Sequence, residues 1–158
     1  MEFLEKDLEE IIFNATKDQL FDADMPLLGK RFRQVRLGCY GVCDILHVYR
    51  DDENVLTFEV LELKKEKIGI SAFLQAVKYI KGIQQYLKKV KNRRPENYNY
   101  EITLVGRSVD TSGSFIFLPD IVSNCIPQFR INLFTYKYGF DGIYFVLHDG
   151  YELTEEGF

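Results

Sequence analysis

The sequence contains no tryptophan, only four prolines and an odd number of cysteines, three. Cys39, Cys43 and Cys125 lack the spacing of a disulfide framework, which predicts free thiols in a reducing compartment. Cys39 and Cys43 have no second ligand pair, which argues against a structural zinc site. No apolar run reaches the roughly 20 residues of a membrane span, and the acidic, amphipathic start is unlike a signal peptide. These absences predict a cytoplasmic protein without a membrane partner.

An excess of basic residues is also missing, since the formal net charge is −4. A protein that only coats nucleic acid is usually basic, so the charge argues against such a scaffold. It does not argue against a nuclease, because a bound cation offsets the charge of an acidic metal-binding cluster. No P-loop is present, which excludes a self-contained ATP-driven enzyme. His47 and His148 have no partner motif, which favours structural roles for both.

The chain of 158 residues is long enough for one well-cored domain, and its polar breaks are short, which predicts a single domain over residues 1–158. Apolar residues at helical spacing predict helices over Phe3–Ala15 and Ile70–Val90. Alternating residues and turn signals predict strands. The strands expected are Arg31–Leu37, Val42–Arg50, Val55–Lys64, Tyr100–Gly106, Phe129–Tyr136 and Gly142–His148, with a short strand over Ser114–Leu118 followed by a helix over Pro119–Cys125. The order α-β-β-β-α-β-(β)-α-β-β predicts an α/β (α+β) domain with a mixed sheet flanked by helices.

The chemistry centres on the expected hairpin, whose polar turn covers residues 51–54. Hairpin numbering places Asp44 across from residue 61 or 62. If the partner is Glu62, both carboxylates lie on one face, and Lys64 shares it because side chains alternate along a strand. Glu59 then points to the other face, which removes it as the first-choice ligand.

Cross-strand neighbours have Cβ atoms about 5 Å apart, so Asp44 and Glu62 would repel each other unless something neutralises them. Mg²⁺ or Mn²⁺ would do so, because these hard cations prefer carboxylate oxygens. An ion pair between Lys64 and an acid, without catalysis, explains the spacing equally well. Spacing alone leaves both interpretations open.

Two helical side chains favour the metal site. Glu5 lies on the flank of the first helix, closer to its apolar face than Glu2, Glu9 or Glu10. Gln75 lies on the flank of the long helix, with Tyr79 one turn further along the same side. If both helices pack on the sheet, Glu5 and Gln75 reach its active end, although each taken singly reads as an ordinary boundary residue.

This ordered set resembles the PD-(D/E)xK nuclease superfamily, and it is most similar to the catalytic domain of NucS-type and RecB-like endonucleases. The resemblance covers roughly residues 2 to 90, and Cys43 stands where a proline often precedes the Asp. It implies a restriction-endonuclease-like three-layer fold. The matching pieces are Glu5-Lys6-Asp7-Leu8, Gly41-Val42-Cys43-Asp44, Glu62-Leu63-Lys64 and Gln75-Ala76-Val77-Lys78-Tyr79.

The resemblance also implies the roles of these residues. Asp44, Glu62 and the backbone carbonyl of Leu63 would hold Mg²⁺ or Mn²⁺, with Glu5 bound directly or through water. Lys64 would orient the attacking water and help stabilise the transition state. Gln75 would position Lys64 or a phosphate, with Tyr79 in support.

Two basic runs could contact a phosphate backbone, with Tyr79 as a further candidate contact. A solvated helix end and edge-strand charges explain these runs equally well. The runs are Lys88, Lys89, Lys91, Arg93 and Arg94, and Lys30, Arg31, Arg33 and Arg36.

The function expected is a metal-dependent endonuclease that hydrolyses DNA, with a role in defence, repair or mobile-element biology. DNA is favoured over RNA, although an RNA-cleaving nuclease is one alternative. The other is a non-catalytic nucleic-acid-binding or assembly module that kept the nuclease fold. A homodimer would fit the cutting of both strands of a duplex.

Overall fold

A six-stranded sheet lies at the centre of the computed structural model, which describes residues 5–140 and 142–148. Its strand order is β1-β2-β3-β5-β7-β8. The first three strands pair antiparallel, β3, β5 and β7 run parallel, and β8 returns antiparallel to β7. The predicted mixed sheet is therefore confirmed. The strands are β1 (Lys30–Arg36), β2 (Val42–Arg50), β3 (Leu56–Leu63), β5 (Asn99–Gly106), β7 (Phe129–Gly139) and β8 (Gly142–Leu147).

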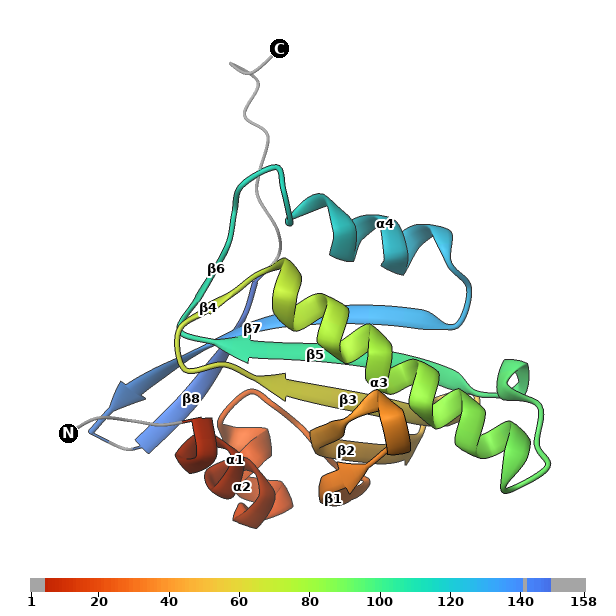
Figure 1. Ribbon diagram of the computed structural model, residues 1–158. Helices are drawn as coiled ribbons and strands as arrows, with labels where there is room; N and C mark the ends of the chain where they lie inside the picture. Colours follow the sequence, from red (N-terminus) through yellow and green to blue (C-terminus); the bar gives the residue numbers. More distant parts are fainter. Residues whose placement is uncertain (1–4, 141, 149–158) are drawn as a thin grey trace.

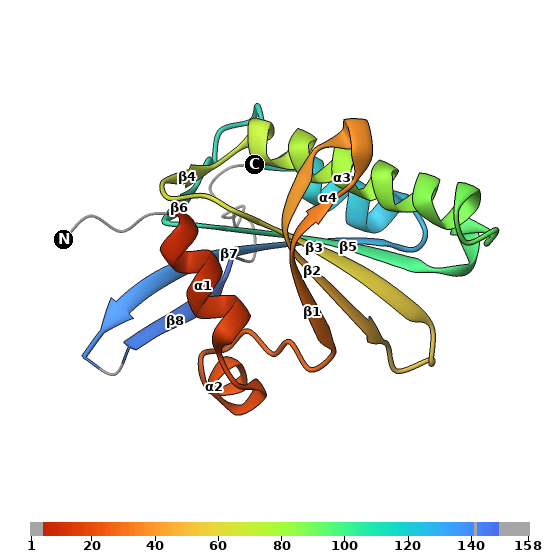
Figure 2. The same ribbon diagram turned by 60° about the horizontal axis from the view of Figure 1, so that its bottom comes forward.

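Helices cover the two faces of this sheet (Figures 1 and 2). The long helix α3 (Ile70–Lys89) and the shorter α4 (Phe117–Cys125) lie on one face, over a core that includes Val60, Ile80 and Ile102. The helices α1 (Glu5–Asn14) and α2 (Lys17–Asp22) lie on the other face and pack on residues such as Leu61 and Val105. This arrangement confirms the predicted three layers.

The hairpin of β2 and β3 has the register that the site requires. Asp51 begins its turn, and Oδ1 of Asp51 accepts the backbone N–H groups of Glu53 and Val55 at 3.0 and 2.8 Å. Ile45 pairs with Leu61, so the same register places Asp44 opposite Glu62. The prediction that Glu59 faces the other side is confirmed, because Glu59 pairs with His47 and contacts its ring.

Several short elements differ from the prediction. The strand expected over Ser114–Leu118 is wrong, because the amides of Phe115 and Ile116 bond to the carbonyl of Ser112 in a turn that leads into α4. The connection after the first helix contains α2, which Thr16 and Gln19 begin with a reciprocal capping box. Two-residue strands β4 (Lys67–Ile68) and β6 (Ser108–Val109) pair with each other, and 3₁₀ turns form at η1 (Gly38–Tyr40) and η2 (Pro95–Asn97). Residues 3 and 4 of the first predicted helix lie outside the described residues.

The three cysteines are free thiols, as predicted. Cys43 is buried and its thiol donates to the carbonyl of Ile45, while Cys39 and Cys125 are exposed. Within residues 5–140 and 142–148, no helix is both long enough and apolar enough to cross a membrane.

Arg31, a member of the second basic run, uses its side chain to stabilise the fold. Its guanidinium donates to the carbonyl oxygens of Ile12 at 2.5 Å and Ala15 at 2.7 Å, which satisfies two acceptors at the end of α1. Because hydrogen bonds from charged groups contribute about 1.5–3 kcal/mol, Arg31→Ala should lower the free energy of unfolding by about 2 kcal/mol. Thermal denaturation checks this, with the exposed Arg36→Ala as a control that should melt like the wild type. Equal melting temperatures for the two variants would contradict it.

Candidate active site

Asp44 and Glu62 lie across from each other where β2 begins and β3 ends. An Asp44 oxygen, Oδ2, accepts the backbone N–H of Leu63 at 3.2 Å, which holds this carboxylate against β3. The ammonium of Lys64 lies 3.2 Å from Oε1 of Glu62. The structure thus brings together the three residues on which the sequence interpretation depends.

In the part of the chain that the structure describes, Glu62 is a buried carboxylate, and only one of its two oxygens is paired. Its side chain is only 3% exposed, and its second oxygen, Oε2, has no hydrogen-bond partner among the described residues. Burial, and then the negative charge of Asp44, raises the pKa of Glu62 to about 7. Burial also raises the pKa of Asp44, and the charge of Glu9 adds to that rise. A cation between the two carboxylates would bind Oε2 of Glu62. It would also lower the free-energy cost of burying the two charges and of their mutual repulsion.

The donor set fits Mg²⁺ or Mn²⁺ better than a metal that needs many protein ligands. Among the described residues, no group of three or more His, Cys, Asp or Glu is placed to hold a metal. Mg²⁺ is commonly held by one or two carboxylates, with waters and substrate phosphates completing its shell. Asp44 and Glu62 supply that minimum.

The helix α3 orients Lys64 through a short chain of side chains. Lys64 donates to Oε1 of Gln75 at 3.4 Å, and the Gln75 amide nitrogen donates to the hydroxyl of Tyr79 at 2.6 Å. Tyr79 is buried, and burial followed by the charge of Glu62 raises its pKa to about 12, so the phenol stays protonated. Gln75 and Tyr79 therefore stand beside the site, one turn apart on one helix.

The contribution of α1 differs from the expectation. Glu5 is exposed, and its carboxylate accepts the backbone N–H of Lys65 at 3.2 Å. Glu9, which was expected farther from the apolar face than Glu5, is instead buried at 6% exposure. That expectation is wrong because α1 contacts β1, β2 and β3, so its flank next to Leu8 is covered as well. Sequence reasoning missed Glu9 because an acidic residue among Glu2, Glu5, Asp7 and Glu10 carries no separate signal.

The basic candidates lie in different surroundings. Arg33 pairs with Glu9 at 3.1 Å and with Glu10 at 3.8 Å, whereas Arg36 is exposed. The basic residues at the end of α3 are exposed and stand at the end of that helix remote from Gln75, roughly 20 Å away along its axis. They are Lys88, Lys89, Arg93 and Arg94.

Comparison with known proteins supports the architecture. No protein-family model matches the chain, and no curated protein matches it. Two solved structures do match. The crystal structure of a repair endonuclease from Pyrococcus abyssi superposes with a TM-score of 0.50 at 18% identity, over 83% of this chain and 46% of that one. The fold is similar to that of a repair endonuclease.

The second structure is a complex of EndoMS with double-stranded DNA, with a TM-score of 0.48 at 20% identity, over 81% of this chain and 44% of that one. This chain thus spans less than half the length of either protein. The resemblance predicted from the sequence is confirmed at the level of the fold, which is like that of a repair endonuclease.

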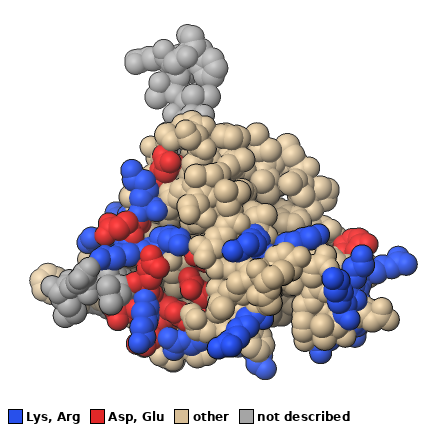
Figure 3. All heavy atoms as spheres, viewed as in Figure 1, with Lys and Arg blue, Asp and Glu red and all other residues tan. Residues whose placement is uncertain are grey.

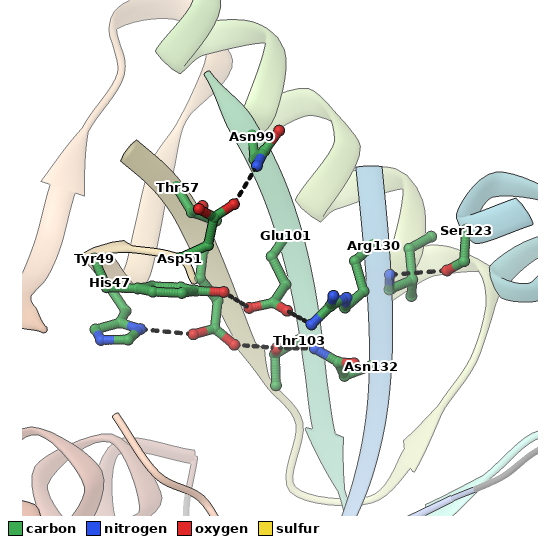
Figure 4. Close-up of polar contacts among 12 residues, drawn as sticks. His47, Tyr49, Asp51, Thr57, Asn99, Glu101, Thr103, Ser123, Arg130 and Asn132 are labelled. Carbon is green, nitrogen blue, oxygen red and sulfur yellow. Dashed lines mark hydrogen bonds and ion pairs between the residues drawn. The ribbon is translucent and has the colours of Figure 1, made fainter. Parts of the chain in front are cut away.

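A second polar cluster lies on the sheet face opposite α3 (Figure 4). His47 accepts the backbone N–H of Gly29 at Nε2, so its Nδ1 carries the proton and donates to Glu59 at 2.7 Å. A side chain at Gly29 would overlap the carbonyl of Val48, so glycine permits this close approach. These contacts are those of a buried histidine that links β2, β3 and the segment before β1, in line with the structural role expected for His47.

The neighbouring carboxylate, Glu101, pairs with Glu59 across parallel strands. It accepts the hydroxyl of Tyr49 at 3.0 Å and lies 3.6 Å from Arg130. Burial, and then the charge of Glu59, raises the pKa of Glu101 to about 7. These groups line an open cavity of about 1050 Å³.

Thr103 should be the most sensitive hydroxyl of this cluster. It is fully buried, donates to Oε2 of Glu59 at 2.5 Å and accepts from Asn132 at 3.3 Å. Thr103→Val keeps the shape but leaves a carboxylate oxygen without its donor, which should cost about 1–3 kcal/mol of unfolding free energy. The matched control is Thr57→Val, because the Thr57 hydroxyl makes a long hydrogen bond of 3.4 Å to the nearby carbonyl of Val55 and is not bonded to a carboxylate among the described residues. Urea denaturation should separate the variants, and equal midpoints would contradict the prediction.

Proposed function

We propose that this chain is a metal-dependent phosphodiesterase that cuts nucleic acid, with DNA favoured over RNA. The observation that carries the proposal is the buried Oε2 of Glu62, which has no hydrogen-bond partner within residues 5–140 and 142–148. Glu62 lies opposite Asp44 and beside the ammonium of Lys64. A carboxylate pair with raised pKa values and an adjacent cation is typical of an active site and costly in a purely structural role. The fold of a repair endonuclease supports the same chemistry.

Asp44 and Glu62 would hold Mg²⁺ or Mn²⁺, with the carbonyl of Leu63 and Glu5 as further ligands, the latter directly or through water. A bound ion of this kind supplies positive charge against a phosphate and lowers the pKa of a water molecule. Glu9 adds negative charge beside Asp44, which strengthens the attraction for a cation.

Lys64 would stabilise the charge that develops on the phosphate and orient the attacking water. Its ammonium is held between Glu62 and Gln75, so it needs little reorganisation when the substrate binds. Gln75 fixes that position, and Tyr79 fixes Gln75. Because Tyr79 is only 3% exposed, we assign it this supporting role in place of a contact with the nucleic acid.

The outer face of α3 offers a path for the phosphate backbone. At about 100° per residue, four lysines of α3 fall within one sector of about 100°, and all four are exposed. They extend roughly 16 Å along the helix from the neighbourhood of Tyr79. Figure 3 shows Lys and Arg side chains spread from the acidic patch next to α1 toward the side on which α3 ends. The four are Lys78, Lys81, Lys88 and Lys89, with Arg93 and Arg94 beyond them.

Reversing charge on this path should weaken nucleic-acid binding. For a DNA duplex, the slope of log affinity against log salt concentration changes by about 0.9 for each phosphate contact. Lys88→Glu/Lys89→Glu removes two such contacts, so it should make this slope shallower by about 2. Fluorescence anisotropy with a labelled duplex measures this. The matched control, Lys17→Glu/Lys30→Glu, makes the same charge change on the α2 and β1 side. Equal weakening in both double variants would show that net charge, and not the α3 path, governs binding.

Cleavage assays test the proposed function itself. Wild-type protein, Glu62→Ala and Lys64→Ala would be incubated with supercoiled, linear and single-stranded DNA and with RNA, in Mg²⁺, Mn²⁺ or EDTA. We expect metal-dependent cutting of DNA by the wild type alone. Cutting of RNA only would change the substrate assignment. A wild type that cuts none of these, or variants that cut equally well, would reject the proposal in favour of a non-catalytic module.

A further inference from the structure

The backbone of Gln34 is strained within β1. Its φ is +51°, a left-handed value that residues with a Cβ rarely adopt. The other described non-glycine residues with positive φ lie in turns and loops outside the strands, whereas Gln34 is in the middle of one. Glycine, aspartate or asparagine would adopt this conformation more easily.

The strain lies directly beside the candidate metal site. Arg33 pairs with Ile45 and Val35 pairs with Cys43, so Gln34 lies opposite Asp44 with no residue inserted in either strand. Strained backbone persists where the surrounding structure holds it, and such positions cluster at functional sites. The location therefore calls for a functional reason.

The side chain of Gln34 supplies that reason. Its amide nitrogen donates to Oε1 of Glu9 at 2.9 Å, and Nε of Arg33 donates to the same oxygen at 3.1 Å. Glu9 is buried, and its charge acts on Asp44. Two donors on one oxygen fix the orientation of the Glu9 carboxylate, and one of these donors belongs to the residue opposite Asp44.

We propose that Gln34 is a positioning residue, whose left-handed backbone holds its carboxamide on Glu9 and so keeps that carboxylate fixed beside Asp44 for cation binding. The inference rests on the proposed function, since it concerns the same metal site. Outer partners of metal ligands orient charge and set affinity, and their loss commonly weakens metal binding about 10- to 100-fold.

Substitutions at Gln34 separate its backbone from its side chain. Alanine removes the contact with Glu9 and keeps the strain, whereas glycine removes both. Metal-free Gln34→Gly should therefore melt at a higher temperature than Gln34→Ala. In an ordinary strand the alanine variant would be the more stable of the two. Because Gln34 is exposed, neither change should unfold the protein. Both variants should lose the same affinity for Mn²⁺, by about tenfold or more.

Gln128 provides a matched control. It is also an exposed glutamine with positive φ, but it precedes β7 and its amide bonds to the carbonyl of Glu96. Gln128→Gly should relieve comparable strain and leave Mn²⁺ affinity unchanged. This control shows whether a change in strain alone alters the metal site.

The deciding experiment is an isothermal titration with Mn²⁺ across a double-mutant cycle of Gln34→Gly and Glu9→Ala, with Glu62→Ala as the reference for a lost site. If Gln34 acts through Glu9, Gln34→Gly weakens binding in the wild type and has no further effect in the Glu9→Ala background. Wild-type affinity in Gln34→Gly, or equal losses in both backgrounds, would overturn the inference while the site itself stands. A wild type that binds no Mn²⁺ would overturn both the inference and the proposed function.

Discussion

Lys64→Met is expected to slow metal-dependent cleavage by about 10²- to 10³-fold, the effect of removing one preorganised donor to a developing charge. The Lys64 ammonium is the cation beside Glu62 and is fixed by Gln75. Methionine keeps most of the side-chain volume and removes only the charge. Mn²⁺ affinity should stay equal or rise, because a positive charge next to the metal site has been lost.

Single-turnover cleavage and Mn²⁺ titration at pH 8 check both parts of this prediction. The control is Lys67→Met, which removes an exposed lysine three residues further along, in β4. It should cut at the wild-type rate. If Lys64→Met also retained the wild-type rate, Lys64 would be only the partner of an ion pair.

Glu62→Gln is expected to abolish Mn²⁺ binding and cleavage and yet to stabilise the metal-free protein at pH 8. Gln lacks the charge that Mn²⁺ requires. The substitution also removes a buried carboxylate whose pKa is raised to about 7 and whose Oε2 has no partner in the described part of the chain. The expected gain in unfolding free energy is about 1–2 kcal/mol, less than the full penalty because the amide also needs partners.

The pH dependence follows from the direction of that shift. The folded protein holds the Glu62 proton more tightly than the unfolded chain, whose carboxyl has a pKa near 4.5. Wild-type stability therefore falls as pH rises from about 4.5 through about 7, while Glu62 loses its proton. Above about pH 7 the folded protein bears the full free-energy cost of the ionised, buried Glu62 carboxylate. The advantage of Glu62→Gln should be largest at pH 8 and small at pH 5.

Thermal melts of Glu62→Gln and the wild type, with and without Mn²⁺, test this prediction. Without metal, Glu62→Gln should melt higher than the wild type, and with saturating Mn²⁺ the order should reverse, because a ligand that binds only the folded state raises its stability. The exposed Glu66→Gln is the control and should follow the wild type in both conditions. A variant that melts below the wild type at pH 8 without metal would contradict the assigned burial cost.

The pairing of Asp44 with Glu62 could be predicted from the sequence because it depends on local features. A polar turn between two apolar runs sets the register of a hairpin, and the register sets which side chains share a face. The long helix α3 could also be predicted from the sequence, since its twenty residues have a clear apolar periodicity. Asp44, Glu62, Lys64 and Gln75 follow from these two elements.

The burial of Glu9 and the strain at Gln34 could not be predicted in the same way. Both depend on how α1 lies across β1, which is a contact between separate elements. A glutamine in an alternating strand carries no sign of a left-handed backbone. Short elements were missed for a related reason, since the two-residue strands β4 and β6 exist only because they pair with each other.

The cluster around Glu59 and Glu101 also depends on distant parts of the chain. These residues are neighbours because β3 and β5 pair in parallel after the α3 crossover. No local pattern sets the register of such a pair, whereas a hairpin turn does so for antiparallel strands. Thr103 likewise contacts Glu59 only because β5 pairs with β3, whereas His47 lies opposite Glu59 in the same hairpin that brings Asp44 and Glu62 together.

Anomalous diffraction from crystals grown with Mn²⁺ at pH 8 tests the central claim most directly. The account predicts a Mn²⁺ peak in contact with the carboxylates of both Asp44 and Glu62 in the wild type, and no peak there in Glu62→Gln crystals under the same conditions. A wild-type crystal with no Mn²⁺ at these carboxylates, or with Mn²⁺ bound only elsewhere, would contradict it.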